Sequence, residues 1–156
     1  MLRVYFDNCI YNRPFDDHQT QEKIFIEAMA FYIVLKWIEN GEIESIISDA
    51  LIYENEKIID FERKLRIKSY FSLSKYHVEL ADSIIERAKE IISLGFKSID
   101  ALHIAMAESG KADFFITCDD AILKKSRGLH DRLQVKIIGI LEFLSEVIYA
   151  KNIEGN

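Results

Sequence analysis

Acidic residues stand where predicted strands of the sequence end and where predicted helices begin. Asp7 follows the first apolar run, and the adjacent Asp119 and Asp120 follow a later one. Glu54 lies in the helix predicted after the second strand, and Asp100 lies in the first turn of another predicted helix. In open α/β sheets, sites form just beyond the carboxyl ends of the strands. We therefore expect these carboxylates to meet at one edge of the sheet.

Several carboxylates at one edge carry a definite chemical implication. They repel one another strongly unless a divalent cation is bound among them. Ligands that are all oxygen atoms favour Mg²⁺ or Mn²⁺ over zinc. Such an ion keeps part of its water shell and can activate a hydroxide for attack on a phosphodiester bond. The residue types thus predict a metal-dependent hydrolase that acts on phosphodiesters.

Each carboxylate also has an ordinary structural interpretation. An Asp after a strand is often a turn residue or a helix cap, and Asp100 near a helix N-terminus is favoured by the helix dipole alone. Glu54 on a helix is more often a solvated surface residue, and its neighbour Glu56 is an equal candidate for the site. The joint pattern favours a site, because several coincidences at one sheet edge are less frequent than one.

The elements that position these carboxylates alternate between strands and helices. Apolar, β-branched and aromatic runs predict strands at residues 2–6, 44–48, around 78, 114–117 and 135–138. Helical patterns and stop signals predict helices at residues 20–40, from 49, 58–70, 84–94, 99–109, 119–125 and 141–149, with Ser98 as the N-cap of the fifth. This alternation predicts an α/β fold: a three-layer α/β/α sandwich with a central, mostly parallel sheet of about five strands.

Length and composition fit one soluble domain. The 156 residues predict a single domain at 1–150 with a C-terminal tail at 151–156. No signal peptide is expected, and no apolar run reaches the roughly 20 residues that a bilayer span requires. Cys9 and Cys118 lack the spacing of a disulfide framework or thiolate metal cage. We expect a cytoplasmic protein with no membrane contact, and its formal charge of −6 argues against a simple nucleic-acid coat.

The helix predicted at residues 20–40 is apolar over much of its circumference. Phe25 and Phe31 follow one helical face, whereas Ile26 and Ile33 fall on other faces. A helix with this pattern is normally buried on more than one side. It therefore lies inside the fold or meets a second subunit, and we predict a homodimer.

Four segments of the sequence resemble the PIN domain. They are Asp7 after the first strand, residues 48–54, the run SIDALHIA at 98–105 and the run ADFFITCD at 112–119. The segments span nearly the whole chain in the family's order, and the D-A-L-H-I-A and T-x-D pieces are the more specific ones. The resemblance implies a three-layer α/β/α fold and a Mg²⁺- or Mn²⁺-dependent endoribonuclease that cleaves RNA. The family includes the ribonuclease toxins of bacterial and archaeal toxin–antitoxin pairs, so an antitoxin protein is a candidate partner.

The resemblance also implies roles for single residues. It assigns the catalytic acidic site to Asp7, Glu54, Asp100 and Asp119, with Thr117 as a supporting hydroxyl. On this basis, we predict that Asp7, Asp100 and Asp119 are the metal ligands. Glu54 is then a further ligand or the base that orients the attacking water.

The sequence departs from the family pattern at three places. Asn8 and Cys9 stand where a pair containing Thr or Ser is often found after the first Asp, and Asn8 is predicted to support the site. Asp120 is a second candidate ligand or supporting residue, and the T-x-D spacing favours Asp119 over it. The polar stretch at residues 12–17 is longer than expected in a minimal toxin and is interpreted as a substrate loop or a cover.

Basic residues near the expected site are candidates for contacts with RNA phosphates, and a solvated face is an equal alternative. They are Arg13, Lys57, Lys124, Lys125 and Arg127, of which Arg13, Lys124 and Lys125 are predicted to bind substrate. His103 lies three residues after Asp100 on the same helical face. We interpret it as a structural histidine in preference to a proton shuttle or metal ligand. The alternative function is a catalytically degenerate PIN-like protein that serves as a protein- or RNA-binding module.

Overall fold

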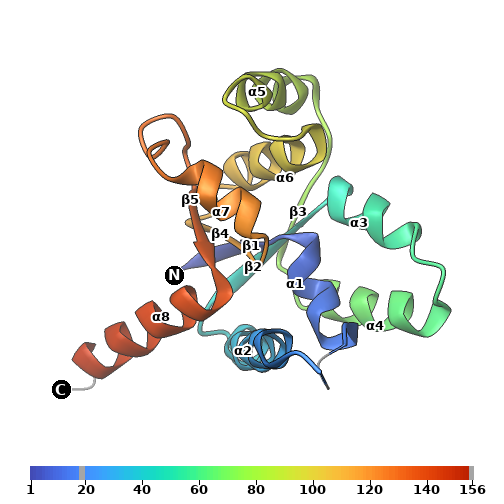
Figure 1. The fold of residues 1–156 in the computed structure, drawn as a ribbon, viewed down its shortest axis with the longest axis vertical. Coiled ribbons are helices and arrows are strands. Elements are labelled where there is room, and N and C mark those ends of the chain that lie inside the picture. Colours follow the sequence, from blue (N-terminus) through green and yellow to red (C-terminus); the bar gives the residue numbers. More distant parts are fainter. Residues whose placement is uncertain (18–19, 155–156) are drawn as a thin grey trace.

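The central feature of the fold is one parallel sheet of five strands in the order β3-β2-β1-β4-β5 (Figure 1). The computed structural model describes residues 1–17 and 20–154, with side chains to residue 150. The strands are β1 (Arg3–Phe6), β2 (Glu44–Ser48), β3 (Tyr76–Val78), β4 (Phe114–Thr117) and β5 (Lys136–Gly139). All four neighbouring pairs run parallel, so the predicted parallel sheet is confirmed.

Helices cover both faces of this sheet and complete the predicted three layers (Figure 1). They are α1 (Asn8–Asn12), the 3₁₀ turn η1 (Arg13–Phe15), α2 (Glu22–Glu39), α3 (Asp49–Glu56), α4 (Phe61–Phe71), α5 (Asp82–Ser93), α6 (Ser98–Ser109), α7 (Asp120–Ser126) and α8 (Ile140–Glu154). Helices α5 and α6 pack together on one side, with α6 against β2 and β4. On the other side, α1, α2 and α8 pack against one another and the sheet, with α4 beside α1.

Strand β1 lies at the centre of the sheet, and its side chains pack into the core on both faces of the sheet. Val4, Tyr5 and Phe6 are fully buried, as expected for a parallel strand covered on both faces. The ring of Tyr5 stacks on Phe115 of β4, with centroids 5.5 Å apart. Phe6 meets Phe31 of α2 edge to face. Strand β1 thus fixes both helical layers, and its last residue stands directly before Asp7.

Some predicted helix boundaries were wrong, and one short helix was missed. Ser98 is the first residue of α6 rather than its N-cap, which is Lys97 and makes no side-chain capping bond. The turn predicted after the first strand is the short helix α1, because the Asp7 side chain accepts a hydrogen bond from the Asn8 backbone N–H and caps it. Helix α8 continues to Glu154 instead of ending near Tyr149. Only residues 155–156 of the predicted tail lie outside the described residues.

Helix α2 is buried on one face and apolar on another that faces solvent. Phe31 and Val34 are fully buried in the core. Phe25, Ile26 and Ile33 remain between 43% and 49% exposed. Of the two sequence-based alternatives for this helix, burial of every apolar face within one chain is therefore wrong. Within residues 1–17 and 20–154, no helix has both the length and the apolar character needed to cross a bilayer.

Gly110 follows α6 at a point where the helix crosses closely over the sheet. A Cβ atom at this position would lie 2.9 Å from both Ile46 Cδ1 and Val78 Cγ2. We expect Gly110→Ala to lower the free energy of unfolding by about 1 kcal/mol, because overpacking displaces these side chains. Urea unfolding measures the change, with the exposed Ser109→Ala as the control. Equal midpoints for Gly110→Ala and wild type would contradict this account.

Candidate functional site

Asp7 stands at the carboxyl end of the central strand and is 6% exposed. Its Oδ1 accepts a hydrogen bond from the Asn8 backbone N–H at 2.8 Å, which caps α1. Its Oδ2 accepts one from the Thr117 hydroxyl at 2.8 Å and one from the Cys9 thiol at 3.5 Å. Burial raises the pKa of Asp7, and the hydrogen bonds from Thr117 and Asn8 oppose this rise. The carboxylate is thus desolvated and held from two elements.

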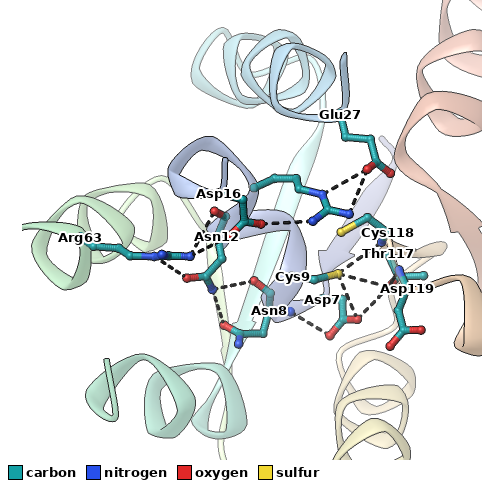
Figure 2. A network of polar contacts seen from close by, with 11 residues as sticks. Asp7, Asn8, Cys9, Asn12, Asp16, Glu27, Arg63, Thr117, Cys118 and Asp119 are labelled. Carbon is teal, nitrogen blue, oxygen red and sulfur yellow. Dashed lines mark hydrogen bonds and ion pairs between the residues drawn. The ribbon is translucent and has the colours of Figure 1, made fainter. Parts of the chain in front are cut away.

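Thr117 connects the ends of β1 and β4 (Figure 2). Besides donating to Asp7, its oxygen accepts a hydrogen bond from the Asp119 backbone N–H at 3.0 Å. Cys9 lies beside it, with 3.4 Å between Sγ and Thr117 Oγ1, and accepts from the Cys118 backbone N–H at 3.3 Å. Two main causes raise the pKa of the Cys9 thiol well above its usual value: the hydrogen bond with Cys118, which has the larger effect, and burial. Cys9 is therefore a protonated thiol and a polar neighbour of Asp7, a role that its sequence position did not predict.

The two adjacent aspartates after β4 have different surroundings. Asp119 caps α7 through Oδ1, which accepts hydrogen bonds from the Ala121 and Ile122 backbone N–H groups at 2.8 and 3.4 Å. Its side chain lies beside Thr117 and Asp7 in Figure 2. Asp120 instead has a side chain that is 80% exposed and forms an ion pair with Lys23 at 2.9 Å. The structure thus separates a carboxylate at the strand end from one on the surface.

Asp100 belongs to the same electrostatic neighbourhood as Asp7 and Asp119. It lies in the first turn of α6 and is half-buried. Burial raises its pKa, and the negative charges of Asp7 and then Asp119 raise it further. Asp100 is therefore close enough to Asp7 and Asp119 for their negative charges to act on it. Within the described part of the chain, no three or more His, Cys, Asp or Glu side chains form a ready-made metal-binding group.

Glu54 joins the same edge from the end of α3. Its Oε2 accepts a hydrogen bond from the Asn8 side-chain amide at 3.1 Å, and its Oε1 is bonded to Nε2 of His103. The neighbouring Glu56 is 49% exposed in its side chain and pairs with Lys68 at 2.9 Å. Of the two glutamates, only Glu54 is thus connected to the residue that follows Asp7. The solvated-surface interpretation of Glu54 was wrong.

A polar network extends from Asn8 toward η1 and α4 (Figure 2). Asn12 donates to the Asn8 carbonyl and side-chain oxygens at 2.9 and 3.1 Å, and Arg63 donates to Asn12 Oδ1 at 3.0 Å. Arg63 also pairs with Asp16 at 3.2 Å. The polar stretch at 12–17 is therefore packed and bonded to α4. Its connection to Arg63, 51 residues away, leaves no local signal in the sequence.

The predicted substrate-binding residues differ in whether their charged groups are exposed or already bonded within the protein. Arg13 donates to Glu27 Oε1 from Nε at 3.1 Å and to Asp16 Oδ2 from Nη1 at 3.1 Å. Glu27 is 5% exposed, so this guanidinium balances a buried carboxylate. Lys124 and Lys125 are exposed in the last turn of α7 and are available to solvent. Lys57 and Arg127 are also exposed, and the Lys57 ammonium lies 4.2 Å from the centre of the Tyr53 ring.

Fold and geometry together define an α/β protein with acidic side chains at the carboxyl ends of β1 and β4 and on the helices α3 and α6. A family model described as the PIN domain matches residues 15–128. The chain therefore belongs to the PIN-domain family, whose members are generally nucleases and typically use divalent metals. The match begins after Asp7, so it does not include the carboxylate that follows β1.

Solved structures share this fold at low sequence identity. VapBC2 from Rickettsia felis, bound to a DNA fragment from its promoter, gives a TM-score of 0.58 at 12% identity, covering 88% of this chain and 98% of that one. PAE2754 from Pyrobaculum aerophilum gives a TM-score of 0.55 at 18% identity, and the match covers 95% of this chain and 98% of that one. FitAcB from Neisseria gonorrhoeae gives a TM-score of 0.55 at 11% identity, and the match covers 88% of this chain and 98% of that one. No curated protein matches the sequence.

Charge repulsion at the site predicts an unusual effect of removing one carboxylate. In metal-free protein, Asp100→Asn is expected to raise the free energy of unfolding by about 1 kcal/mol or less, since solvent screens a half-buried group. The pKa of Asp100 is raised in the folded protein, so its negative charge destabilises the folded state and its removal is expected to stabilise it. This gain in stability is present at neutral pH. It disappears as the pH falls to about 3.9, the usual pKa of Asp, and below, because the Asp100 carboxyl of wild type is then protonated and as uncharged as the Asn that replaces it.

Melting curves in EDTA between acid and neutral pH measure this gain. Asp82→Asn is the control, because Asp82 is also in the first turn of a helix but belongs to α5. Its replacement is expected to be neutral or slightly destabilising through the helix dipole. A lower melting temperature for Asp100→Asn at neutral pH would contradict the repulsion and favour the dipole explanation.

Proposed function

We propose that the protein is a metal-dependent endoribonuclease that cleaves RNA phosphodiester bonds at this acidic edge. The observation that carries the proposal is the hydrogen-bonded arrangement of Asp7, Thr117 and Asp119 at the ends of β1 and β4. Beside it, burial and then repulsion by Asp7 and Asp119 raise the pKa of Asp100. Three carboxylates at the ends of parallel strands and the start of a helix are placed where a cation would relieve that repulsion. Family membership supports the choice of a nuclease.

The donor set fits a hard divalent cation. Asp7, Asp100 and Asp119 supply oxygen ligands, which suit Mg²⁺ or Mn²⁺. Asp119 uses Oδ1 for the cap of α7, and within the described residues its Oδ2 accepts no hydrogen bond. When bound, the ion lowers the pKa of a coordinated water and stabilises negative charge on the phosphate.

The chain's own residues hold and orient this site. Thr117 and the Asn8 backbone fix the Asp7 carboxylate from opposite oxygens. In the proposal, Glu54 is a further ligand or the base that orients the attacking water, and the hydrogen bonds to both of its oxygens fix its orientation. Lys124 and Lys125 are the exposed cations proposed to meet RNA phosphates. Arg13 is better assigned to holding Glu27 and Asp16, since its guanidinium is bonded to both.

The proposal extends to partners and setting. A toxin with an antitoxin partner, in the cytoplasm, agrees with the family and with the unpaired cysteines Cys9 and Cys118. A homodimer agrees with the exposed apolar residues of α2. A catalytically degenerate module that binds protein or RNA is the alternative, and the next experiment separates it from a nuclease.

Cleavage of labelled RNA in the presence of Mn²⁺ tests the reaction. Asp119→Asn is expected to lower the rate by about a hundredfold or more, because it weakens metal binding and charge stabilisation. Asp120→Asn, at the adjacent position, is expected to stay within about twofold of wild type, because Asp120 pairs with Lys23 on the surface. EDTA should abolish cleavage by wild type.

Melting temperature supplies a second readout for the metal. At one hundred times the dissociation constant, Mn²⁺ should stabilise wild type by roughly 2.7 kcal/mol, and Asp119→Asn by much less. A wild-type protein that neither cleaves RNA nor responds to Mn²⁺ would reject the nuclease proposal. Cleavage that both aspartate variants retain would point to a contaminating enzyme.

The assembly is tested by light scattering at micromolar concentration. Wild type is expected to have the mass of a dimer. Ile33→Lys is expected to shift it toward a monomer, because a charge enters the exposed apolar face of α2. Ile59→Lys is the control, since Ile59 is 99% exposed and lies between α3 and α4. A monomeric wild type would reject the homodimer and leave the apolar face uncovered.

A further inference from the structure

A fully buried chain of hydrogen bonds stands behind Glu54. The Tyr5 hydroxyl lies 2.6 Å from Ser48 Oγ and 2.6 Å from His103 Nδ1. The other ring nitrogen of His103, Nε2, is bonded to Glu54 Oε1. Ser48 and Tyr5 are 0% exposed and His103 is 1% exposed. Three polar side chains are thus buried in contact with one another and lead to a single carboxylate.

The members of this chain come from the elements that carry the acidic site. Tyr5 belongs to β1, which ends directly before Asp7. Ser48 caps α3, the helix that carries Glu54, by accepting a hydrogen bond from the Leu51 backbone N–H at 3.2 Å. His103 lies in α6, one turn after Asp100. The chain therefore joins the three elements that carry or lead to Asp7, Glu54 and Asp100.

Counting donors and acceptors assigns the hydrogens of this chain. A carboxylate only accepts, so His103 carries a hydrogen on Nε2 and donates it to Glu54. A second hydrogen on Nδ1 would make Tyr5 donate to Ser48 and leave the buried Ser48 hydroxyl without an acceptor among the described residues, so Nδ1 accepts and the Tyr5 hydroxyl is its donor. Burial raises the pKa of Tyr5 well above its usual value, so this hydroxyl keeps its proton. Tyr5 in turn accepts from the Ser48 hydroxyl, and every group in the chain is satisfied.

Glu54 is consequently fixed through both oxygens. His103 donates to Oε1, and the Asn8 amide donates to Oε2 at 3.1 Å. The His103 ring itself cannot turn freely, because Tyr5 holds Nδ1 and the Tyr5 ring stacks on Phe115. With both ring nitrogens occupied and almost no exposed surface, His103 is placed to orient a neighbouring group rather than to bind metal or RNA.

We propose that His103 is a positioning residue, which fixes the Glu54 carboxylate through Nε2 while Tyr5 fixes the tautomer of His103 through Nδ1. This inference rests on the proposed nuclease function, in which Glu54 binds the metal or orients the attacking water. Outer partners of this kind typically change activity or metal affinity by about 10- to 100-fold when they are removed.

The tautomer is tested without any enzymatic activity. Long-range ¹H–¹⁵N correlation spectra of the metal-free, full-length protein distinguish a histidine protonated at Nε2 from one protonated at Nδ1. We expect wild-type His103 to be protonated at Nε2 alone. In Tyr5→Phe, the Nδ1 resonance should move downfield, because it loses its donor. In Tyr11→Phe it should stay in place, since Tyr11 is equally buried but is not part of the chain.

Kinetics of RNA cleavage with Mn²⁺ test the consequence for Glu54. Tyr5→Phe is expected to lower kcat about tenfold with KM within about twofold, and Tyr11→Phe is expected to match wild type. At position 103, His103→Gln retains an amide donor toward Glu54, whereas His103→Leu does not. The Gln variant should therefore keep a kcat about tenfold higher than the Leu variant.

The outcomes separate this inference from the proposed function. Wild-type protonation at Nδ1, or an unshifted Nδ1 in Tyr5→Phe, would overturn the hydrogen-bond chain whatever the activity. Active wild type with equal kcat for Tyr5→Phe and Tyr11→Phe would overturn the positioning role and leave the nuclease intact. An inactive wild type would overturn the nuclease, and the positioning role with it, while the spectra still decide the tautomer.

Discussion

Burial of the Asp7 carboxylate is the constraint on which the carboxyl edge of the sheet depends. A desolvated carboxylate requires several donors, and those of Asp7 come from two distant parts of the chain. The Asn8 N–H is available because α1 starts immediately after β1, and the Thr117 hydroxyl is available because β4 pairs beside β1. The same contacts place Asp119 next to Asp7. One buried charge therefore sets how two strands end and how two helices begin.

Capping and metal binding are compatible roles at this edge. Asp7 and Asp119 each cap a helix through Oδ1, so the structural interpretation of an Asp after a strand is correct for both. A carboxylate has two oxygens, and the helix N–H groups occupy only one of them. The second oxygen of Asp7 accepts from Thr117 and Cys9, whereas the α7 cap uses only Oδ1 of Asp119. The helix N-termini also present partial positive charge to the carboxylates. Strand-to-helix junctions therefore make an acidic cluster tolerable in a folded chain.

The sequence predicted those parts of the fold and site that follow from local pattern. Strands such as 114–117 and helices such as 99–109 follow from residue type and periodicity, and parallel pairing follows from their alternation. Helix α1 was missed because five residues carry too little periodicity, and its start depends on the Asp7 cap. Arg13 was predicted to face substrate because nothing local reveals its pairing with Glu27. The bond between Tyr5 and His103 joins residues 98 positions apart, so it is visible only in three dimensions.

The hydrogen bond between Asp7 and Thr117 joins residues 110 positions apart, and this distance has a consequence for biosynthesis. The central strand leaves the ribosome before its partner β4, which follows it by more than a hundred residues. At synthesis rates of about 5–20 residues per second, the interval is roughly 5 to 20 seconds. During that interval Asp7 has neither the Thr117 hydroxyl nor the carboxylate that follows β4. A nascent chain therefore lacks the paired strand ends that hold Asp7 and Asp119 until β4 has been translated.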